Sequence, residues 1–550
     1  MEYLIIGSII LILIFLVSHQ LSKQKRKRRI EEIRSSWGRP KSESFHFVSI
    51  RKYADSVNAQ FHRLTDQTLE DIDFNQLFVF IDRTTSRVGQ QFLYKKLIEP
   101  TNSTKDSSEE LTNAFIKNAD LRETMQLELY KLNENDAYYI STLLQDRFLI
   151  EEPTWLKLLT LDIAIVVSLL ALAVKFPVLL VFLIFTTTLN MFVHYWNKSN
   201  MFQFTRSIPQ LNLLIQVASE LLKKGDLLHD VSVKESISKL RSFQRKASLI
   251  KFDVQRGFQD ELSQIGNYFL DIVKAFFLIE IIVFFKVMKE LRDKQSSIIT
   301  LFNYVGTIDT AIAVASLRAG KLKTCQPAFV PVKKELVVKN IYHPLIENCV
   351  KNNLSINNRS ILITGSNMSG KSTFLRTLMI NSILAQTIYT CFADEYISPL
   401  VKQFSSIRID DNLFEGKSYY FQEVNVMASL LAEIKSPHQN LFVLDEVFKG
   451  TNTIERIASA KAILSYLNSN NNIVIVSTHD IELAGMLTSE YDLYHFTETI
   501  ENNKLHFDHT IKSGQVRTRN AIKILELSNY PIDIINEARQ ISATLTTAKQ

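Results

Sequence analysis

The hydrophobic pattern along the chain is uneven, and its first long apolar run lies at the N-terminus. Residues 4–17 are apolar apart from one glycine and one serine, and six basic residues follow within residues 23–29. A cleavable signal peptide carries its positive charge before the apolar run, so this order favours an uncleaved anchor whose basic flank stays in the cytoplasm. The pattern predicts a transmembrane anchor over residues 1–20 and a basic cytosolic linker over residues 21–64.

A second apolar run covers residues 158–193 and carries only two charged side chains, one of which is Asp162. A Lys-Phe-Pro sequence divides this run into two halves of roughly 17 to 20 residues, the length that a bilayer requires. Trp155 precedes the run and Trp196 follows it, where indole rings would lie at the level of the lipid headgroups. The pattern predicts a transmembrane helical hairpin over residues 155–197. The alternative is that both apolar runs are core helices of a large soluble domain.

A third apolar stretch, residues 272–290, contains the charged side chains Lys274, Glu280 and Lys286. Each unpaired charge at the centre of a bilayer would cost about 3 kcal/mol. We therefore expect a buried helix of a folded domain here rather than a membrane span.

The overall composition narrows the function classes only slightly. The chain has 550 residues, of which 63 are basic and 57 acidic, and its net charge of +6 permits contact with nucleic acid or anionic lipid without requiring either. Its three cysteines are widely spaced and form no CxxC pair, which indicates a reducing compartment and gives no thiolate metal site.

A glycine-rich motif at residues 364–374, TGSNMSGKSTF, indicates a phosphate site. It follows a short β-rich run and precedes apolar residues at helical spacing, which is the strand, loop and helix context of a P-loop. In such a loop the glycines let backbone N–H groups face the phosphates, the lysine neutralises phosphate charge and the following hydroxyl ligates Mg²⁺. The candidate nucleotide-binding residues are Gly365, Asn367, Met368, Ser369, Gly370, Lys371, Ser372 and Thr373.

Two further apolar runs end in side chains that suit hydrolysis of a nucleotide. The run at residues 440–445 ends at Asp445, which can hold Mg²⁺, and Glu446 follows, which can orient or deprotonate an attacking water. The run at residues 472–478 is followed by His479, whose imidazole could contact the γ-phosphate. Because the carboxyl ends of parallel strands meet at one edge of a sheet, we expect these side chains to lie together.

The motif sequences resemble those of a known family. The stretches TGSNMSGKST, LDEVFKGTN and STHD look like the Walker A, Walker B and histidine-switch motifs of the MutS family of DNA mismatch-repair ATPases. The pair Asn367-Met368 is the discriminating feature because generic P-loop proteins do not share it, whereas Ser366 stands where the family usually has proline.

Further segments extend the resemblance. Residues 341–356 are similar to the family's His-Pro segment, residues 68–100 to the start of its helical core, and residues 517–540 to the helices that close its dimers. Residues 408–424 are similar to its signature loop, in which Ser418 would reach the nucleotide of the opposite subunit.

The resemblance implies an α/β P-loop ATPase domain of the ABC and MutS type that follows an all-α core and lever domain, and the apolar runs add transmembrane helices to this fold. On this basis the helical core occupies residues 65–154 and 198–335, and the ATPase domain with its dimerisation helices occupies residues 336–550. The implied activity is hydrolysis of ATP with Mg²⁺ in a homodimer. The expected catalytic residues are Glu446, His479 and Ser418, and the expected metal ligands are Ser372 and Asp445.

Two functions stay open. The resemblance implies binding of mismatched or branched DNA in a repair-related role. The apolar runs and the basic flank predict that the chain is a multi-pass protein of the cell membrane that contacts lipid and has a cytoplasmic ATPase domain. The first 50 residues, however, form an anchor and a basic tail and leave no room for the family's mismatch-recognition domain. The alternative is a membrane conformational switch or scaffold that ATP drives and that no longer binds DNA. An ABC-type transporter is disfavoured because the chain has no LSGGQ-like stretch.

Overall fold

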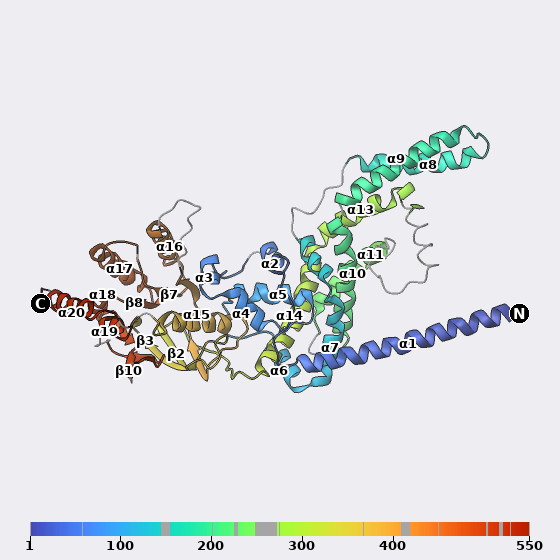
Figure 1. Ribbon diagram of the computed structural model, residues 1–550. Helices are drawn as coiled ribbons and strands as arrows, with labels where there is room; N and C mark the ends of the chain where they lie inside the picture. Colours follow the sequence, from blue (N-terminus) through green and yellow to red (C-terminus); the bar gives the residue numbers. More distant parts are fainter. Residues whose placement is uncertain are drawn as a thin grey trace. The chain divides into compact units, whose positions relative to one another are not determined.

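The chain folds into two compact units, which are described separately (Figure 1). The helical unit comprises Met1–Asn58, Ile81–Lys95 and Ser107–Gly320, and the sheet unit comprises Ala59–Phe80, Lys96–Asp106 and Lys321–Gln550. This computed structural model describes all residues except 1, 58, 145–153, 201, 225–228, 248–271, 274, 367, 409–418, 449, 502–503, 516–520, 529 and 549–550.

The described residues of the helical unit form helices and no strand. The helices are α1 (Glu2–Ser36), α2 (Phe47–Ser56), α5 (Arg87–Ile98), α6 (Glu109–Lys117), α7 (Ala119–Leu129), α8 (Leu156–Ala173), α9 (Leu179–Asn200), α10 (Phe202–Leu222), α11 (Val231–Ala247), α13 (Ile279–Asp293) and α14 (Gln295–Arg318), with the short 3-10 segments η1 (Tyr130–Leu132) and η2 (Asn135–Leu144).

Helix α14 forms the centre of the helical unit. Every residue from Ile308 to Leu317 is buried, and the helix packs against α6, α10 and α11. Asp309 on this helix accepts hydrogen bonds from the backbone N–H groups of Thr85 and Ser86, both at 2.7 Å, and thereby caps the N-terminus of α5. A Cβ atom at Gly89 would lie 2.1 Å from the Asp309 carboxylate, so this close approach requires a glycine.

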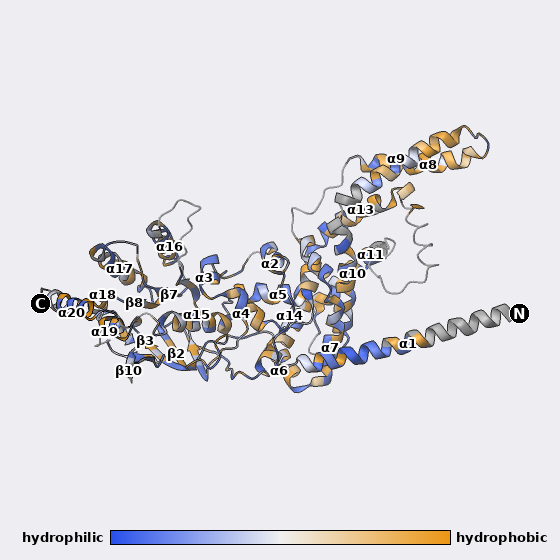
Figure 2. Ribbon diagram, in the orientation of Figure 1, coloured by the Kyte–Doolittle hydropathy of each residue, from blue (hydrophilic) through white to orange (hydrophobic). Residues whose placement is uncertain are grey.

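Three helices in the described part of the chain are long and apolar enough to cross a membrane, namely α8, α9 and α14. The apolar window is 72% buried in α14 but only 12% buried in α8 and 11% in α9. Helix α14 is therefore a core helix, whereas the α8–α9 hairpin exposes an apolar surface along its length (Figure 2). The stretch expected to form a buried helix at 272–290 overlaps α13, whose Phe284 and Met288 are fully buried.

The sheet unit is built on a six-stranded sheet with the strand order β12-β9-β4-β8-β7-β6. The five strands from β9 to β6 run parallel, and β12 pairs antiparallel with β9. The strands of this sheet are β4 (Ser360–Thr364), β6 (Lys402–Ser406), β7 (Asn440–Asp445), β8 (Ile473–Thr478), β9 (Tyr491–His495) and β12 (Lys512–Ser513). Residues in β4, β7 and β8 are almost all buried, as expected for parallel strands covered on both faces.

Smaller sheets and helices surround this central sheet. A four-stranded sheet has the order β1-β5-β2-β3, and β10 pairs antiparallel with β11. These strands are β1 (Ala328–Phe329), β2 (Glu335–Ile341), β3 (Asn352–Asn357), β5 (Glu395–Ser398), β10 (Glu498–Glu501) and β11 (Lys504–Phe507). The helices are α3 (Asp66–Asp71), α4 (Phe74–Ile81), α15 (Lys371–Thr387), α16 (Tyr419–Glu433), α17 (Thr453–Leu467), α18 (Ile481–Met486), α19 (Ala521–Leu527) and α20 (Ile532–Ala548).

One apolar cluster holds the sheet unit in register. Side chains of β4, β6, β7 and β8 pack there against α16, α17 and α18. Since the central strands are parallel, this packing aligns the carboxyl ends of β4, β7 and β8 at one edge of the sheet.

The observed units divide the chain differently from the expected segments. Residues 65–80 and 96–106, expected in the helical core, and residues 59–64, expected in the linker, belong to the sheet unit. The expected linker at residues 21–64 contains the second half of α1 and all of α2, whose Ile50 and Ala54 are fully buried. Contacts between residues far apart in sequence determine these assignments, and hydrophobic periodicity does not report such contacts.

Candidate nucleotide-binding site

The loop between β4 and α15 has the backbone of a phosphate-binding loop. Gly365 has a φ of 152° and Gly370 a φ of 108°, values that side-chain-bearing residues rarely adopt. A Cβ atom at Gly365 would lie 2.9 Å from the carbonyl oxygen of Phe496, and one at Gly370 would lie 3.1 Å from Nδ1 of His509. Both motif glycines are thus required for backbone conformation as well as for close packing.

Lys371 lies inside this loop and is only 4% exposed. Its Nζ donates hydrogen bonds to the carbonyl oxygens of Gly365 at 2.9 Å and Ser366 at 2.8 Å. Ser369 also donates to the Ser366 carbonyl, at 2.8 Å. The loop therefore curls around a buried ammonium group at the N-terminus of α15, where the helix dipole adds further positive potential.

An oxygen-rich pair lies where β7 ends beside α15. Ser372 Oγ donates a hydrogen bond of 2.5 Å to Oδ2 of Asp445, and Ser477 on β8 donates to the other carboxylate oxygen. Hydroxyl and carboxylate oxygens are ligands that Mg²⁺ prefers, and these two lie close enough to bind the same ion. The two residues expected as metal ligands are thus brought together, and their donor chemistry fits the ion.

Glu446 and His479 follow the ends of β7 and β8 and contact each other. Glu446 Oε1 lies within hydrogen-bond distance of Nε2 of His479, and the Glu446 backbone N–H donates to the Ser477 carbonyl at 3.0 Å. Glu446 has a left-handed φ of 53°, a conformation that costs a non-glycine residue about 1 kcal/mol or more and is found at functional sites. Lys371 Nζ lies 3.5 Å from the same His479 nitrogen, so Glu446, His479 and Lys371 form one cluster.

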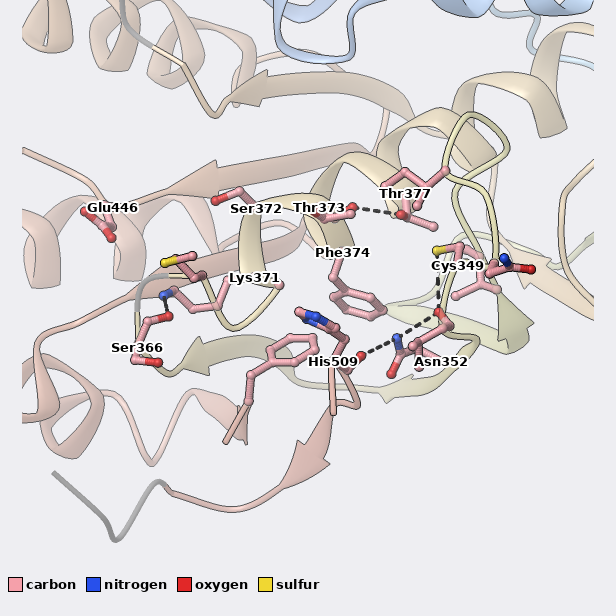
Figure 3. A pocket seen from close by; sticks show the side chains of 17 residues that line it. Cys349, Asn352, Ser366, Lys371, Ser372, Thr373, Phe374, Thr377, Glu446 and His509 are labelled. Atoms are coloured by element: carbon pink, nitrogen blue, oxygen red, sulfur yellow. Dashed lines mark hydrogen bonds between the residues drawn. The ribbon is translucent and has the colours of Figure 1, made fainter. Parts of the chain in front are cut away.

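A cavity of about 350 Å³ extends from this cluster along the P-loop (Figure 3). Its walls include the expected Met368, Gly370, Lys371, Ser372, Thr373 and Glu446. An apolar part is formed by Ile346, Val350, Phe374 and Phe496. The volume lies within the usual range of ligand pockets, roughly 300 to 1,000 Å³.

Two wall residues, Asn352 and His509, carry no signal in the sequence. Asn352 on β3 donates to the His509 carbonyl at 3.1 Å and accepts from the N–H of Ile511 at 2.8 Å. This contact holds His509 beside the loop, with its Nδ1 3.1 Å from the carbonyl oxygen of Ser369. This contact joins segments separated by 157 residues, and no short sequence motif predicts it.

Three sequence-predicted residues are either exposed or lie outside the described part of the structure. Met368 is 81% exposed with a left-handed φ of 71°. Asn367, at the centre of the discriminating pair, and Ser418, expected to act across a dimer interface, both lie outside the described residues.

Comparisons with known proteins agree with these motifs. A family model for MutS domain V matches residues 361–546. The DNA mismatch repair protein MutS of Pseudothermotoga lettingae is 29% identical over 321 residues, which cover 56% of this chain and 39% of that protein. The MutS protein of Geobacillus sp. (strain WCH70) is 31% identical over 231 residues, 40% of this chain and 26% of that protein. The chain thus spans well under half the length of these relatives.

The matched region contains β4, the P-loop, α15 and the strand ends that carry Asp445, Glu446 and His479. Domain V is the ATPase-containing C-terminal region of MutS proteins, and its motifs occur here in a mixed α/β fold. Residues 361–546 of this chain therefore form a domain of the MutS family.

Proposed function

We propose that the sheet unit binds ATP with Mg²⁺ and hydrolyses it. The observation that carries this proposal is the convergence of Lys371, Ser372, Asp445, Glu446 and His479 at one sheet edge. Bound Mg²⁺ would neutralise phosphate charge as it develops. Lys371 binds the phosphates, Ser372 and Asp445 hold the metal, and Glu446 orients a water and takes its proton. His479, through its contact with Oε1, keeps the Glu446 carboxylate in position.

The test separates nucleotide binding from hydrolysis. Glu446→Gln keeps the shape of the side chain but removes the base, so ATP should still bind while the hydrolysis rate falls by a factor of about 100 to 10,000. Glu433→Gln is the matched control, because Glu433 lies at the end of α16 and pairs with Lys402 at 3.4 Å, outside the cavity. A Glu446→Gln variant that hydrolyses ATP at the wild-type rate would refute the assignment.

We also propose that the apolar first part of α1 and the α8–α9 hairpin lie in a membrane. The hairpin exposes large apolar side chains and buries two polar ones, whereas a soluble helix pair turns its polar side chains outward. Phe182, Phe185 and Phe192 are 59%, 68% and 70% exposed, whereas Asn190 and His194 are 4% and 6% exposed. An exposed apolar surface of this extent requires a covering partner, and lipid matches its length and composition.

The polar inner face supports the same proposal. Asn190 Nδ2 donates hydrogen bonds to Oδ2 of Asp162 at 2.6 Å and to the carbonyl oxygen of Phe276 at 2.8 Å. Ionisable side chains inside membrane segments face the protein interior and are paired in this way.

A labelling experiment tests this topology. Val178 at the hairpin tip is 73% exposed, and with a cytoplasmic sheet unit this tip would face the other side of the membrane. In intact cells a membrane-impermeant maleimide should label Val178→Cys but not wild type, whose three cysteines all lie in the sheet unit. Labelling of Val178→Cys only after lysis would contradict the proposed topology.

The role that the ATPase serves is proposed from its relatives, which are named DNA mismatch repair proteins. We propose that a dimer of this protein binds mismatched or branched DNA at the membrane. The alternative is an ATP-driven membrane switch without DNA, and the exposed apolar hairpin favours it. The ATPase rate of the detergent-solubilised protein should change on addition of duplex or branched DNA, less so at higher salt. An unchanged rate without DNA binding supports the membrane switch.

A further inference from the structure

A second cavity, in the helical unit, is lined mainly by positive charge. It has a volume of about 600 Å³ and lies between the end of α10 and residues 234–241 of α11. The cationic residues in its wall are Lys223, Lys224, His229, Lys234 and Arg241. Cavities of this size hold small ligands, and the lining selects an anionic one.

Neighbouring acids pair with two of the lysines in the cavity wall but not with the cations on α11. Glu220 pairs with Lys223 at 2.7 Å, and Glu128 with Lys224 at 3.0 Å. In the described part of the chain, Lys234 and Arg241 form no ion pair. These two residues stand seven positions apart on one face of α11, with the buried Ile237 between them.

The cavity lies at the end of the helical unit that the basic flank of α1 approaches. Helices α1 and α7 run antiparallel, because Arg34 hydrogen-bonds Glu123 at 2.8 Å while Arg29 stacks 3.2 Å from the ring centroid of Tyr130. The carboxyl end of α7 therefore points toward the apolar part of α1.

Glu128, at that end of α7, links the two basic regions. It accepts from Lys131 at 2.5 Å and from Lys224 at 3.0 Å, which places the cavity wall beside the turn that Arg29 contacts. Arg29, the last of the six basic residues, and Lys224 in the cavity wall thus both lie near the carboxyl end of α7.

We propose that this cationic cavity binds the phosphate group of an anionic phospholipid headgroup. Lysine and arginine side chains bind phosphate through charge-assisted hydrogen bonds, and Leu222 and Ile237 in the wall offer contact to the glycerol and the start of the acyl chains. A soluble phosphate compound would satisfy the same chemistry without the apolar contact. This inference goes beyond the proposed ATPase and rests on its membrane location.

The experiment uses the full chain in detergent and measures binding of short-chain phosphatidylglycerol and phosphatidylcholine by native mass spectrometry. Wild type should bind phosphatidylglycerol about tenfold more tightly than phosphatidylcholine. Lys234→Gln with Arg241→Gln should remove this preference. Lys239→Gln is the matched control, because Lys239 lies on the same helix, pairs with Glu235 at 2.8 Å and is not part of the cavity wall. ATPase activity of each variant reports that it is folded.

The possible outcomes are distinct. An equal preference in the double variant and in wild type would overturn the proposal. Competition by glycerol 3-phosphate at the concentration of the lipid would reassign the cavity to a soluble phosphate compound, and loss of duplex DNA binding alone would reassign it to nucleic acid. Because binding is measured in detergent, failure here leaves the labelling of Val178→Cys, and hence the membrane proposal, unaffected.

Discussion

At the scale of single residues, the hydrogen bond between Ser372 and Asp445 determines how the metal would be held. Asp445 carries the only full charge of the pair, so Asp445→Asn should remove most of the benefit that Mg²⁺ gives to nucleotide binding. We expect ATP affinity in the presence of Mg²⁺ to fall by roughly tenfold to a hundredfold, with little change in EDTA. Titration with a fluorescent ATP analogue measures both conditions.

Asp492→Asn serves as the control for that substitution. Asp492 lies on β9 of the same sheet and pairs with Arg359 at 3.3 Å on the surface. If both variants respond to Mg²⁺ as wild type does, Asp445 is not a ligand.

His343 provides a pH-dependent term in the stability of the sheet unit. Its side chain is buried, its Nδ1 accepts from the N–H of Leu345 at 3.3 Å, and burial together with the charge of Arg376 lowers its pKa to about 4. The unfolded chain takes up the proton near pH 6.5, so this stabilisation is complete above pH 6.5 and is lost as the pH falls toward 4.

Between pH 7.5 and pH 5 the contribution of His343 to the free energy of unfolding should fall by about 2 kcal/mol. His343→Gln cannot titrate, so its unfolding midpoint should depend less on pH than that of wild type over this interval. Unfolding in urea at both pH values measures the difference, and the exposed His438→Gln should behave as wild type does. Parallel pH profiles for wild type and His343→Gln would exclude the histidine as the cause.

At the scale of elements, the short helix α3 is attached to the end of β6 by a buried carboxylate. Asp71 accepts hydrogen bonds from Ser405 Oγ at 2.6 Å, from the N–H of Ile407 at 3.0 Å and from the N–H of Arg408 at 2.7 Å. Two residues on, Asp73 forms a bidentate pair with Arg408 at 2.7 and 3.1 Å. These contacts explain why a segment so distant in sequence belongs to the sheet unit.

Asp71→Asn should loosen this attachment, because an amide offers one acceptor oxygen and places an N–H group against another N–H. The substitution should destabilise the attachment of α3 to β6 by about 2 kcal/mol. Hydrogen exchange of the Ile407 and Arg408 amides should accelerate, while exchange in β8 stays at the wild-type rate. Unchanged exchange at these two amides would show that the attachment does not depend on the carboxylate.

The inner face of the α8–α9 hairpin allows a second prediction at this scale. Asn190→Leu removes both hydrogen bonds of the amide and leaves Asp162 without its Asn190 partner. We expect the free energy of unfolding in detergent to fall by about 1 kcal/mol, although the substitution makes the helix more apolar. Thr188→Leu adds similar hydrophobicity on the exposed face and should be neutral or stabilising. Equal thermal midpoints for the two variants would contradict this account.

At the scale of the whole molecule, sequence patterns predicted features that depend on neighbouring residues and missed contacts between segments far apart in sequence. The P-loop and the ends of β7 and β8 follow from short motifs, because parallel strands bring their carboxyl ends together. The attachment of residues 59–80 to the sheet unit and the position of His509 beside Gly370 depend on contacts across more than 100 residues. The apolar α14 also shows that composition cannot separate a core helix from a membrane span, because only burial distinguishes them.

The continuity of α1 has a mechanical consequence. The helix runs for 35 residues, about 50 Å, from the apolar run through the basic flank. Near its end, Arg34 donates a hydrogen bond to Glu123 on α7. No loop interrupts it. With the apolar run in a bilayer, as proposed above, a rotation of the helical unit would change the tilt of that run, and the thickness of the bilayer would then enter the energy of the rotation.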